Sequence, residues 1–385
     1  MKLNYSYVIY IFVYILIFLV PYGVIPSYFI FSGDNPIANK LFELFIVSTI
    51  VYTISLSFDF LPPLQIRKIS LDFDKIFLLF FSFFLLTSFV IVFTAPSIPL
   101  IDSLRGADAF ELSEGREAFL KARKGVFSLL GYLIGFINSY FLPYLIILGL
   151  IRKNKYVYIV IALFSFYTIL SLEKAYFLKL GIPLFFLYFY NAKNKFFFAL
   201  KGATVLALIF ALMFSLSRFT GSEADSNEVF FSILYTPQNG LEAFFWRSTI
   251  VPIVSALDGL RVFTYTFESG FFNGDTSSFI AYLKGSTHIN FERYLYQFQF
   301  GGSETGNANQ VYLVEAFINF GYFGVAIFTI FVAKYIKTSL DSDDVALKSI
   351  LPLFLFHIYN AGLIAILLSN GLLFFILFLV FVKLK

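Results

Sequence analysis

Long apolar stretches alternate with short polar segments along most of this chain. A transmembrane helix needs about 20 predominantly apolar residues, because the hydrocarbon core of a bilayer is about 30 Å thick. By this criterion the pattern predicts about ten spans, at 7–29, 41–58, 75–95, 126–150, 156–172, 175–191, 197–216, 311–333, 349–368 and 371–384. The predicted fold is therefore an all-α polytopic membrane protein.

A long polar segment, residues 217–310, lies between the seventh and eighth predicted spans. It separates a first part with seven spans, residues 1–216, from a last part with three spans, residues 311–385. Within the long segment, apolar residues recur with helical spacing over Leu241–Tyr265, and Pro252 interrupts the pattern. We therefore expect one large, partly helical loop between two sets of transmembrane helices.

The distribution of lysine and arginine predicts how the spans are oriented, because short cytoplasmic loops are enriched in these residues. With the amino terminus inside, the inner loops and chain ends hold these basic residues: Lys2, Arg67, Lys68, Lys75, Arg152, Lys153, Lys155, Lys193, Lys195, Lys201, Lys334, Lys337, Lys348, Lys383 and Lys385. Both termini are therefore expected in the cytoplasm, and residues 217–310 on the outer face.

Two outer segments break this pattern by being rich in basic residues. In loop 96–125, acidic residues nearly balance the basic ones, so solvated loop charge remains an alternative interpretation there. In the long segment, Arg247 and Arg261 are about four helical turns apart, so an unbroken helix places them on one face. Two aligned arginines on an amphipathic helix at the membrane surface suit a phosphate group.

Two further basic residues stand at predicted span ends. Lys174 follows the fifth span and Arg218 follows the seventh. Charge at this depth is costly unless it is paired or functional. The alternatives to a functional role are pairing with Glu173 for Lys174 and snorkelling to the interface for either residue.

Composition narrows the functional classes. Hydrophobic residues make up 59% of the 385 residues and charged residues only 14%, which a soluble domain could not accommodate. The chain has no cysteine, so disulfides, thiol nucleophiles and cysteine-ligated metals are excluded. A net charge of +4 gives no indication of nucleic-acid binding. The sequence also has no ligand spacing for a metal and no glycine-rich nucleotide loop, so we expect no cofactor.

The topology and several short motifs resemble the oligosaccharide repeat-unit polymerases of the O-antigen polymerase family, and more distantly the O-antigen ligases. The motifs are Ser171-Leu172-Glu173-Lys174-Ala175, Trp246-Arg247 followed by Phe271-Phe272-Asn273-Gly274, and Asn307-Ala308-Asn309-Gln310-Val311-Tyr312-Leu313 followed by Asn319-Phe320-Gly321-Tyr322-Phe323-Gly324. One departure concerns the ligases, which commonly place a histidine before the asparagine that ends the large loop. Ala308, or Asn307 in a shifted register, stands there in this chain.

The resemblance implies a GT-C-like fold in a bacterial inner membrane, with the large loop in the periplasm. It implies metal-independent, inverting transfer of a growing glycan from undecaprenyl diphosphate to the sugar of an incoming lipid-linked repeat unit. Membrane lipids and a chain-length regulator are expected as partners, and nucleic acid is not. A ligase or other lipid-linked glycosyltransferase, and a repeat-unit flippase, remain alternatives.

In this interpretation the departing diphosphate needs cations, and the acceptor hydroxyl needs orientation and a general base. The candidate diphosphate-binding residues are Lys174, Arg218, Arg247 and Arg261. The candidate catalytic residues are His288, Asp258 and Glu304. The candidate sugar-binding residues are Trp246, Asn307 and Asn309.

Overall fold

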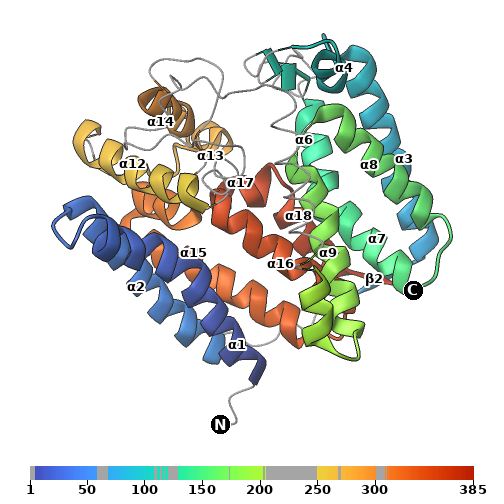
Figure 1. The fold of residues 1–385 in the computed structure, drawn as a ribbon, viewed down its shortest axis with the longest axis horizontal. Helices are drawn as coiled ribbons and strands as arrows, with labels where there is room; N and C mark the ends of the chain where they lie inside the picture. Colours follow the sequence, from blue (N-terminus) through green and yellow to red (C-terminus); the bar gives the residue numbers. More distant parts are fainter. Residues whose placement is uncertain are drawn as a thin grey trace. The chain divides into compact units, whose positions relative to one another are not determined.

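The computed structural model describes residues 5–58, 68–107, 111–112, 115–116, 118–119, 129–172, 174–202, 204, 249–267, 270–300, 308 and 310–385. Over these residues the protein is all-α, with 15 α-helices, two π-helical segments and one short pair of parallel strands (Figure 1). The predicted all-α fold class is thereby confirmed for the described residues.

Five helical stretches of the described chain are long and apolar enough to cross a membrane. They are Tyr7–Ile30, Pro36–Ser57, Phe73–Thr94, Leu129–Ile151 and Tyr312–Asp341. Three shorter apolar helices are Val157–Ser171, Val345–Asn360 and Leu372–Phe381. A multi-pass membrane protein is therefore confirmed, whereas the predicted total of about ten spans stays a prediction. The predicted span at 197–216 lies largely outside the described residues.

The chain forms two compact units, and each combines segments that are distant in sequence. The first comprises residues 1–61, 193–341 and 356–363, and the second comprises residues 62–192, 342–355 and 364–385. The elements of the first are α1 Tyr5–Tyr14, η1 Ile15–Ile30, α2 Pro36–Ser57, α12 Val251–Thr266, α13 Ser278–Lys284, α14 Phe291–Phe300 and α15 Tyr312–Asp341. Helix α16, Val345–Asn360, continues from the second unit into the first.

The second unit holds most of the remaining elements. They are β1 Ile69–Leu71, α3 Phe73–Thr94, α4 Pro99–Leu104, α6 Leu129–Phe136, η3 Ile137–Phe141, α7 Leu142–Ile151, α8 Val157–Ser171, α9 Lys174–Asn191, α17 Leu363–Leu368, α18 Leu372–Phe381 and β2 Val382–Leu384. Strand β1 pairs in parallel with β2, with Ile69 opposite Val382. The Arg152 guanidinium donates to the Leu384 and Lys385 carbonyls at 3.0 and 2.5 Å. Residue 152 and the carboxyl terminus, two segments predicted to be cytoplasmic, therefore lie at the same end of this unit.

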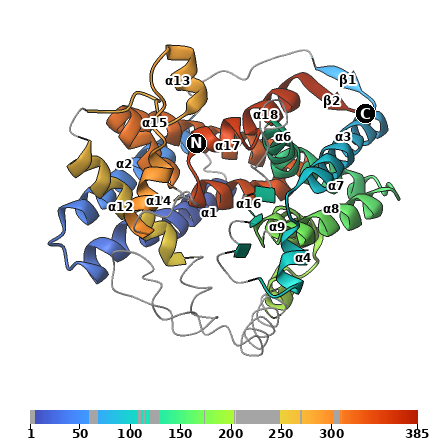
Figure 2. The same cartoon turned by 90° about the horizontal axis from the view of Figure 1, so that it is seen from above.

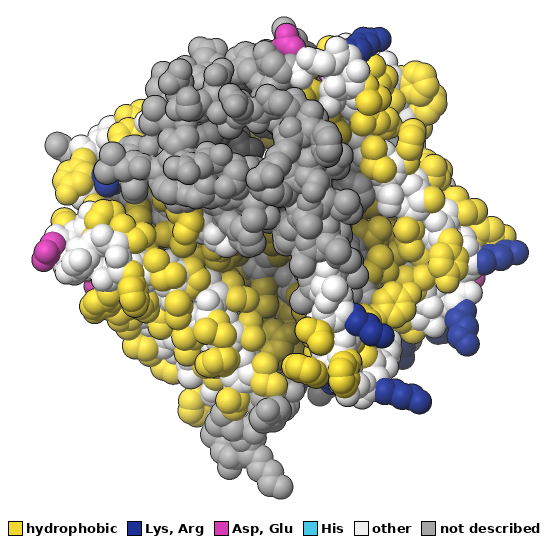
Figure 3. Space-filling view, viewed as in Figure 1, with side chains coloured by type: hydrophobic (Ala, Val, Ile, Leu, Met, Phe, Trp, Pro, Cys, Tyr) yellow, Lys and Arg dark blue, Asp and Glu magenta, His cyan; other side chains and the backbone are white. Residues whose placement is uncertain are grey.

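The outward faces of the spanning helices are apolar. On α3, the side chains of Leu86, Phe89 and Phe93 are 61%, 60% and 72% exposed. Figure 3 shows mostly apolar side chains over the coloured part of one face, with few lysine and arginine side chains. Lipid is the solvent that tolerates such a surface, because a monomer in water rarely exposes large contiguous apolar patches.

Helix α2 is the scaffold of the first unit. Asn35 caps it by accepting the backbone N–H groups of Ile37 and Ala38, and Pro36 occupies the first helical position, where no N–H is needed. Phe45 of α2 stacks on Tyr22 of η1 with ring centroids 5.0 Å apart. The capped end of α2 therefore fixes one end of the bundle, and aromatic stacking joins α2 to the amino-terminal helix.

Helix α15 is not straight, because the chain folds back on itself at Gly321. This residue has φ 62° and ψ −151°, a conformation that glycine adopts far more readily than other residues. A Cβ atom on Gly324 would overlap the carbonyl oxygen of Ala316. The Tyr312 hydroxyl lies beside Thr329, although a straight helix would separate these residues by about 25 Å. Helix α15 is therefore a helical hairpin with its tip at Gly321.

The longer arm of this hairpin runs the length of α2. Directly after the tip, the Tyr322 hydroxyl is hydrogen-bonded to Lys40 and Glu43 in the first turns of α2. At the other end, the Lys334 ammonium donates to the Phe58 carbonyl at 2.7 Å. The arm that follows Gly321 is thus long enough to span the membrane beside α2.

The shorter arm begins about halfway along α2. The Tyr312 hydroxyl is hydrogen-bonded to Tyr14, and Tyr14 is also hydrogen-bonded to Ser48 at 2.8 Å. The Tyr52 ring stacks on Tyr14 with centroids 4.1 Å apart. A re-entrant segment of this kind is tolerated at membrane depth where protein surrounds it and its polar groups find partners. The predicted span at 311–333 therefore covers both arms of the hairpin, and the arm from Tyr322 to Asp341 is the one long enough to cross a membrane.

Candidate functional site

Helix α12 carries two of the predicted site residues and is buried along most of its length. The α-helix begins at Val251, directly after the π-helical residues 249–250, so Pro252 stands in the first turn of the α-helix. Every residue from Pro252 to Leu260 is buried. The expected amphipathic surface helix is therefore enclosed by protein along this stretch. The proposed alignment of Arg247 with Arg261 lies outside the described residues.

Asp258 of α12 is fully buried and holds two partners. One carboxylate oxygen lies 3.5 Å from the Arg261 guanidinium, one turn later on the helix. The other accepts a hydrogen bond from the Gln299 side-chain amide at 3.0 Å. A buried carboxylate is costly unless it is paired and hydrogen-bonded, so Asp258 constrains Arg261, whose side chain is 33% exposed. Arg261 is thus a partly accessible cation anchored by an inaccessible anion.

Two glutamine side chains lie against the same face of α12. The Gln310 amide donates to the Ser255 carbonyl at 3.1 Å and packs on Gly259, where a Cβ atom would approach it within 2.5 Å. The amide nitrogens of Gln299 and Gln310 are both committed to α12, and both side chains are buried. Their amide oxygens have no hydrogen-bond donor in the described structure. These two buried acceptors are therefore available to a ligand or water that can donate.

His288 belongs to a different hydrogen-bonded cluster. It is exposed, in the loop after α13, and its Nε2 atom lies 3.2 Å from the Thr276 carbonyl oxygen. In the turn before α13, Asp275 pairs with Lys284 at 2.6 Å and accepts from the Ser286 hydroxyl at 2.5 Å. The Lys284 ammonium and the Ser286 hydroxyl hold the pKa of the Asp275 carboxyl below its usual range. The described contacts therefore do not join His288 to Asp258.

The structure brings together two motifs that the sequence separates. The backbone N–H groups of Phe272 and Asn273 donate to the carbonyls of Ile318 and Asn319 at 3.0 and 2.9 Å. The Asn319 side chain accepts the Gly274 N–H at 3.0 Å. The loop segment Phe271–Gly274 therefore sits on the tip of the α15 hairpin, within the motif Asn319–Gly324.

Glycine is required on both sides of this junction. Gly321 has positive φ, and a Cβ atom there would lie 2.8 Å from the Phe271 ring. Gly274 also has positive φ, and a Cβ atom there would lie 2.8 Å from Ile280. The glycines of the two motifs thus let the loop and the hairpin tip approach closely.

The other predicted site residues are not placed. Six lie outside the described residues: Arg218, Trp246, Arg247, Glu304, Asn307 and Asn309. Lys174 begins α9 in the second unit, and its side chain is outside the described part. Sequence reasoning missed Gln299, because an isolated glutamine carries no motif signal and meets Asp258 only through the fold. It gave no site role to Gln310, which stands in the quoted motif but reaches Ser255 and Gly259 of α12 only in the folded chain. Among the described residues, no three His, Asp or Glu side chains lie close enough to hold a metal ion.

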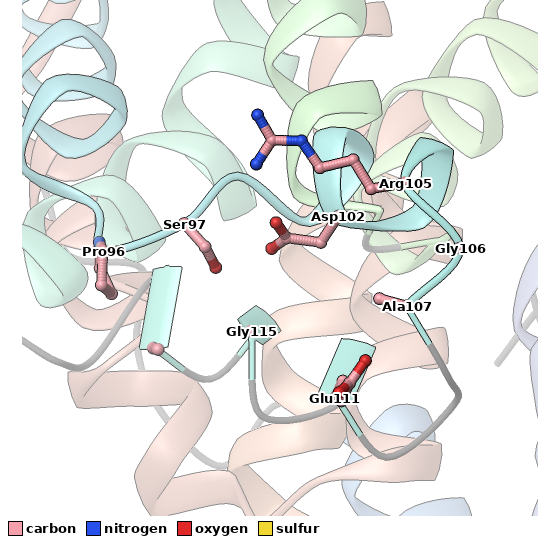
Figure 4. A pocket seen from close by; sticks show the side chains of 9 residues that line it. Pro96, Ser97, Asp102, Arg105, Gly106, Ala107, Glu111 and Gly115 are labelled. Carbon is pink, nitrogen blue, oxygen red and sulfur yellow. The ribbon is translucent and has the colours of Figure 1, made fainter.

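The second unit carries an open cavity of about 560 Å³ after α3 (Figure 4). Its lining includes Asp102, Arg105 and Glu111. The Asp102 carboxylate and Ser97 hydroxyl both lie 3.5 Å from the position of a Cβ atom on Gly115, so they share one wall. This cavity lies within the predicted basic loop 96–125, and its wall carries both signs of charge. Such a lining suits a ligand with neutral polar groups better than a strongly anionic ligand.

Comparisons with protein-family models, with curated proteins and with solved structures found no match to this chain.

Proposed function

We propose that this protein polymerises oligosaccharide repeat units linked to undecaprenyl diphosphate, at the periplasmic face of a bacterial inner membrane. The observation that carries the proposal is the anchored cation Arg261, held by the buried Asp258 on a helix enclosed within the membrane protein. A fixed guanidinium matches the charge and geometry of a diphosphate better than a mobile ammonium. The junction of Phe271–Gly274 with Asn319 adds support, because both segments belong to the motifs that resemble the polymerases.

The reaction is a displacement at the anomeric carbon of the growing glycan. A hydroxyl of the incoming repeat unit attacks this carbon from the face opposite the diphosphate, and a new glycosidic C–O bond forms. The bond to the diphosphate oxygen breaks, and its electron pair leaves with undecaprenyl diphosphate. The hydroxyl proton passes to a base, for which His288 and Glu304 are the candidates. Asp258, the third residue predicted for this role, is buried and paired, so it is assigned instead to holding Arg261. Arginines facing the diphosphate favour this step because they neutralise charge that grows in the transition state.

Roles for the remaining residues follow from their chemistry. Lys174, Arg218 and Arg247 are proposed to join Arg261 around the diphosphate, while Trp246, Asn307 and Asn309 are proposed to contact the sugars. The buried acceptor oxygens of Gln299 and Gln310 suit donors such as hydroxyl groups. Both termini are proposed to be cytoplasmic, and a chain-length regulator is the expected protein partner.

Genetic complementation tests this proposal. A strain that lacks the gene should retain lipid-linked and transferred single repeat units and lose only long glycan. A plasmid copy should restore the ladder, and an Arg261→Ala copy present at equal level in the membrane should not. Ladders of normal length from the deletion strain would refute the proposal.

A repeat-unit transporter is the second candidate, and one observation favours it. Helix α15 is interrupted at Gly321, and transporters commonly build substrate sites from interrupted helices. Such sites lie near the bilayer midplane, whereas Gly321 lies beside the first turns of α2, so the transporter ranks second. In a transporter, deletion would trap repeat units in the cytoplasmic leaflet and abolish even single-unit transfer. The deletion strain therefore distinguishes the two candidates directly.

A further inference from the structure

Helix α13 displays three large apolar side chains on a short, well-capped helix. Ser277 caps its first turn by accepting the Ile280 N–H at 3.4 Å, and Gly285 ends it in the left-handed conformation with φ 68°. Phe279, Tyr282 and Leu283 are 53%, 82% and 67% exposed. Three neighbouring apolar side chains this exposed are unfavourable in water, so another apolar medium is expected around them.

The position of α13 identifies that medium. Its first residues follow the turn that hydrogen-bonds to Ile318 and Asn319 at the hairpin tip, and Ile280 packs on Gly274 of that turn. At the same tip, Phe323 of the spanning arm is 74% exposed, as expected of a lipid-facing side chain at the end of a span. Figure 2 shows α13 beyond α15, at the margin of the first unit. The exposed apolar side chains of α13 and the exposed Phe323 therefore belong to segments that meet at the same hairpin tip.

The charge around α13 is balanced. Lys284, its last residue, is paired with Asp275 at 2.6 Å, so the helix presents no unpaired cation from this residue to lipid headgroups. Tyrosine is typical of the boundary between headgroups and acyl chains, where its apolar ring and its polar hydroxyl are both accommodated. This chemistry favours the interface of a neutral bilayer over an anionic patch or the acyl-chain core.

We propose that α13 is a membrane-interface anchor, with Phe279, Tyr282 and Leu283 inserted among the lipid headgroups that surround the tip of the α15 hairpin. The anchor holds the loop from Gly270 to Asn290 at headgroup depth. His288 is thereby kept at the level where lipid phosphates lie. This inference does not depend on the proposed function, because it concerns only the contact between α13 and lipid.

Depth-dependent fluorescence quenching tests the anchor. The chain contains a single tryptophan, so Trp246→Phe provides a silent background. Tyr282→Trp in that background would be placed in phosphatidylcholine nanodiscs whose lipids carry bromine either near the headgroup end or near the end of the acyl chains. Leu86→Trp on α3 serves as the control inside the bilayer, and Asp343→Trp in the polar turn after α15 as the control in water.

The expected result is a larger loss of Tyr282→Trp emission with shallow bromine than with deep bromine, and less quenching by aqueous iodide than at Asp343→Trp. Leu86→Trp should show the opposite depth preference. Iodide quenching equal to that of Asp343→Trp without bromine quenching would overturn the anchor, as would quenching by deep bromine alone. If Tyr282→Trp does not yield a monodisperse protein, Leu283→Trp carries the same test.

Discussion

The side chain of Asn319 accepts the backbone N–H of Gly274 at 3.0 Å, and this bond joins the polar loop to the tip of the re-entrant hairpin. The same amide donates to the Thr276 hydroxyl at 2.8 Å and to the Glu315 carbonyl at 2.9 Å. Asn319 is fully buried, so no water replaces these partners. The Asn319 side chain, together with the backbone bonds of Phe272 and Asn273, therefore fixes the segment that leads to α13 and His288.

Asn319→Ala should loosen this junction. It leaves the buried Gly274 N–H without its acceptor, which costs about 1–3 kcal/mol. The expected result is a lower unfolding temperature in detergent and faster hydrogen exchange at residues 272–276. Asn39→Ala, which removes an exposed bond to the Gly33 carbonyl, is the matched control and should change neither measurement appreciably. Unchanged exchange at residues 272–276 in Asn319→Ala would show that the junction is held by other contacts.

Gly259→Ala should destabilise the packing of Gln310 on α12. The new methyl group would lie within 2.5 Å of the Gln310 amide, and overpacking of a buried site costs about 1–3 kcal/mol. Gly181→Ala on α9 is the control, because a Cβ atom there meets nothing within 4 Å. Thermal unfolding of the two variants should therefore differ, with only Gly259→Ala less stable than the parent. Equal stability would mean that Gln310 moves aside freely.

The contact between Asp275 and Lys284 should make the loop sensitive to acid. The pKa of Asp275 is lower in the folded protein than in the unfolded chain. The contact therefore stabilises the folded loop fully at pH above the unfolded pKa of about 3.9. This stabilisation of the loop is lost as the pH falls through the folded pKa. Proteolytic protection of the loop should be constant near neutral pH and fall in strong acid. Asp275→Asn should remove this extra acid sensitivity while leaving the acid response of the rest of the protein. If the variant keeps the full pH dependence, another group is responsible.

Cysteine labelling tests the orientation of the chain in the membrane. Because the chain has no cysteine of its own, each introduced cysteine is the only site of labelling. Thr287→Cys should react with a membrane-impermeant maleimide in intact spheroplasts, because its loop is proposed to be periplasmic. Lys155→Cys, in the turn before α8, should react only after permeabilisation. Both positions are exposed, so accessibility alone does not distinguish them. The reverse labelling pattern would invert the proposed topology.

The sequence pattern predicts the position of a helix well when lipid and apolar side chains surround it along its whole length. The predicted spans 41–58 and 75–95 match α2 and α3 closely, because apolar composition and length alone determine them. It was insufficient at α15, where both arms of the hairpin are apolar and only the backbone of Gly321 reverses the chain. The Asp258–Gln299 contact was equally inaccessible, because it depends on the packing of α14 against α12 and leaves no local periodicity.

Reconstitution of the purified protein in liposomes with lipid-linked repeat units tests the central claim most directly. Gel electrophoresis of the released glycans should show a ladder of lengthening products, and the ladder should persist in excess EDTA. Arg261→Ala should abolish the ladder, and Arg261→Lys should recover little of it, because a point charge does not reproduce the planar guanidinium. Repeat units that cross the bilayer without lengthening would contradict the claim and favour a transporter. A ladder made equally well by Arg261→Ala would remove this arginine from the site.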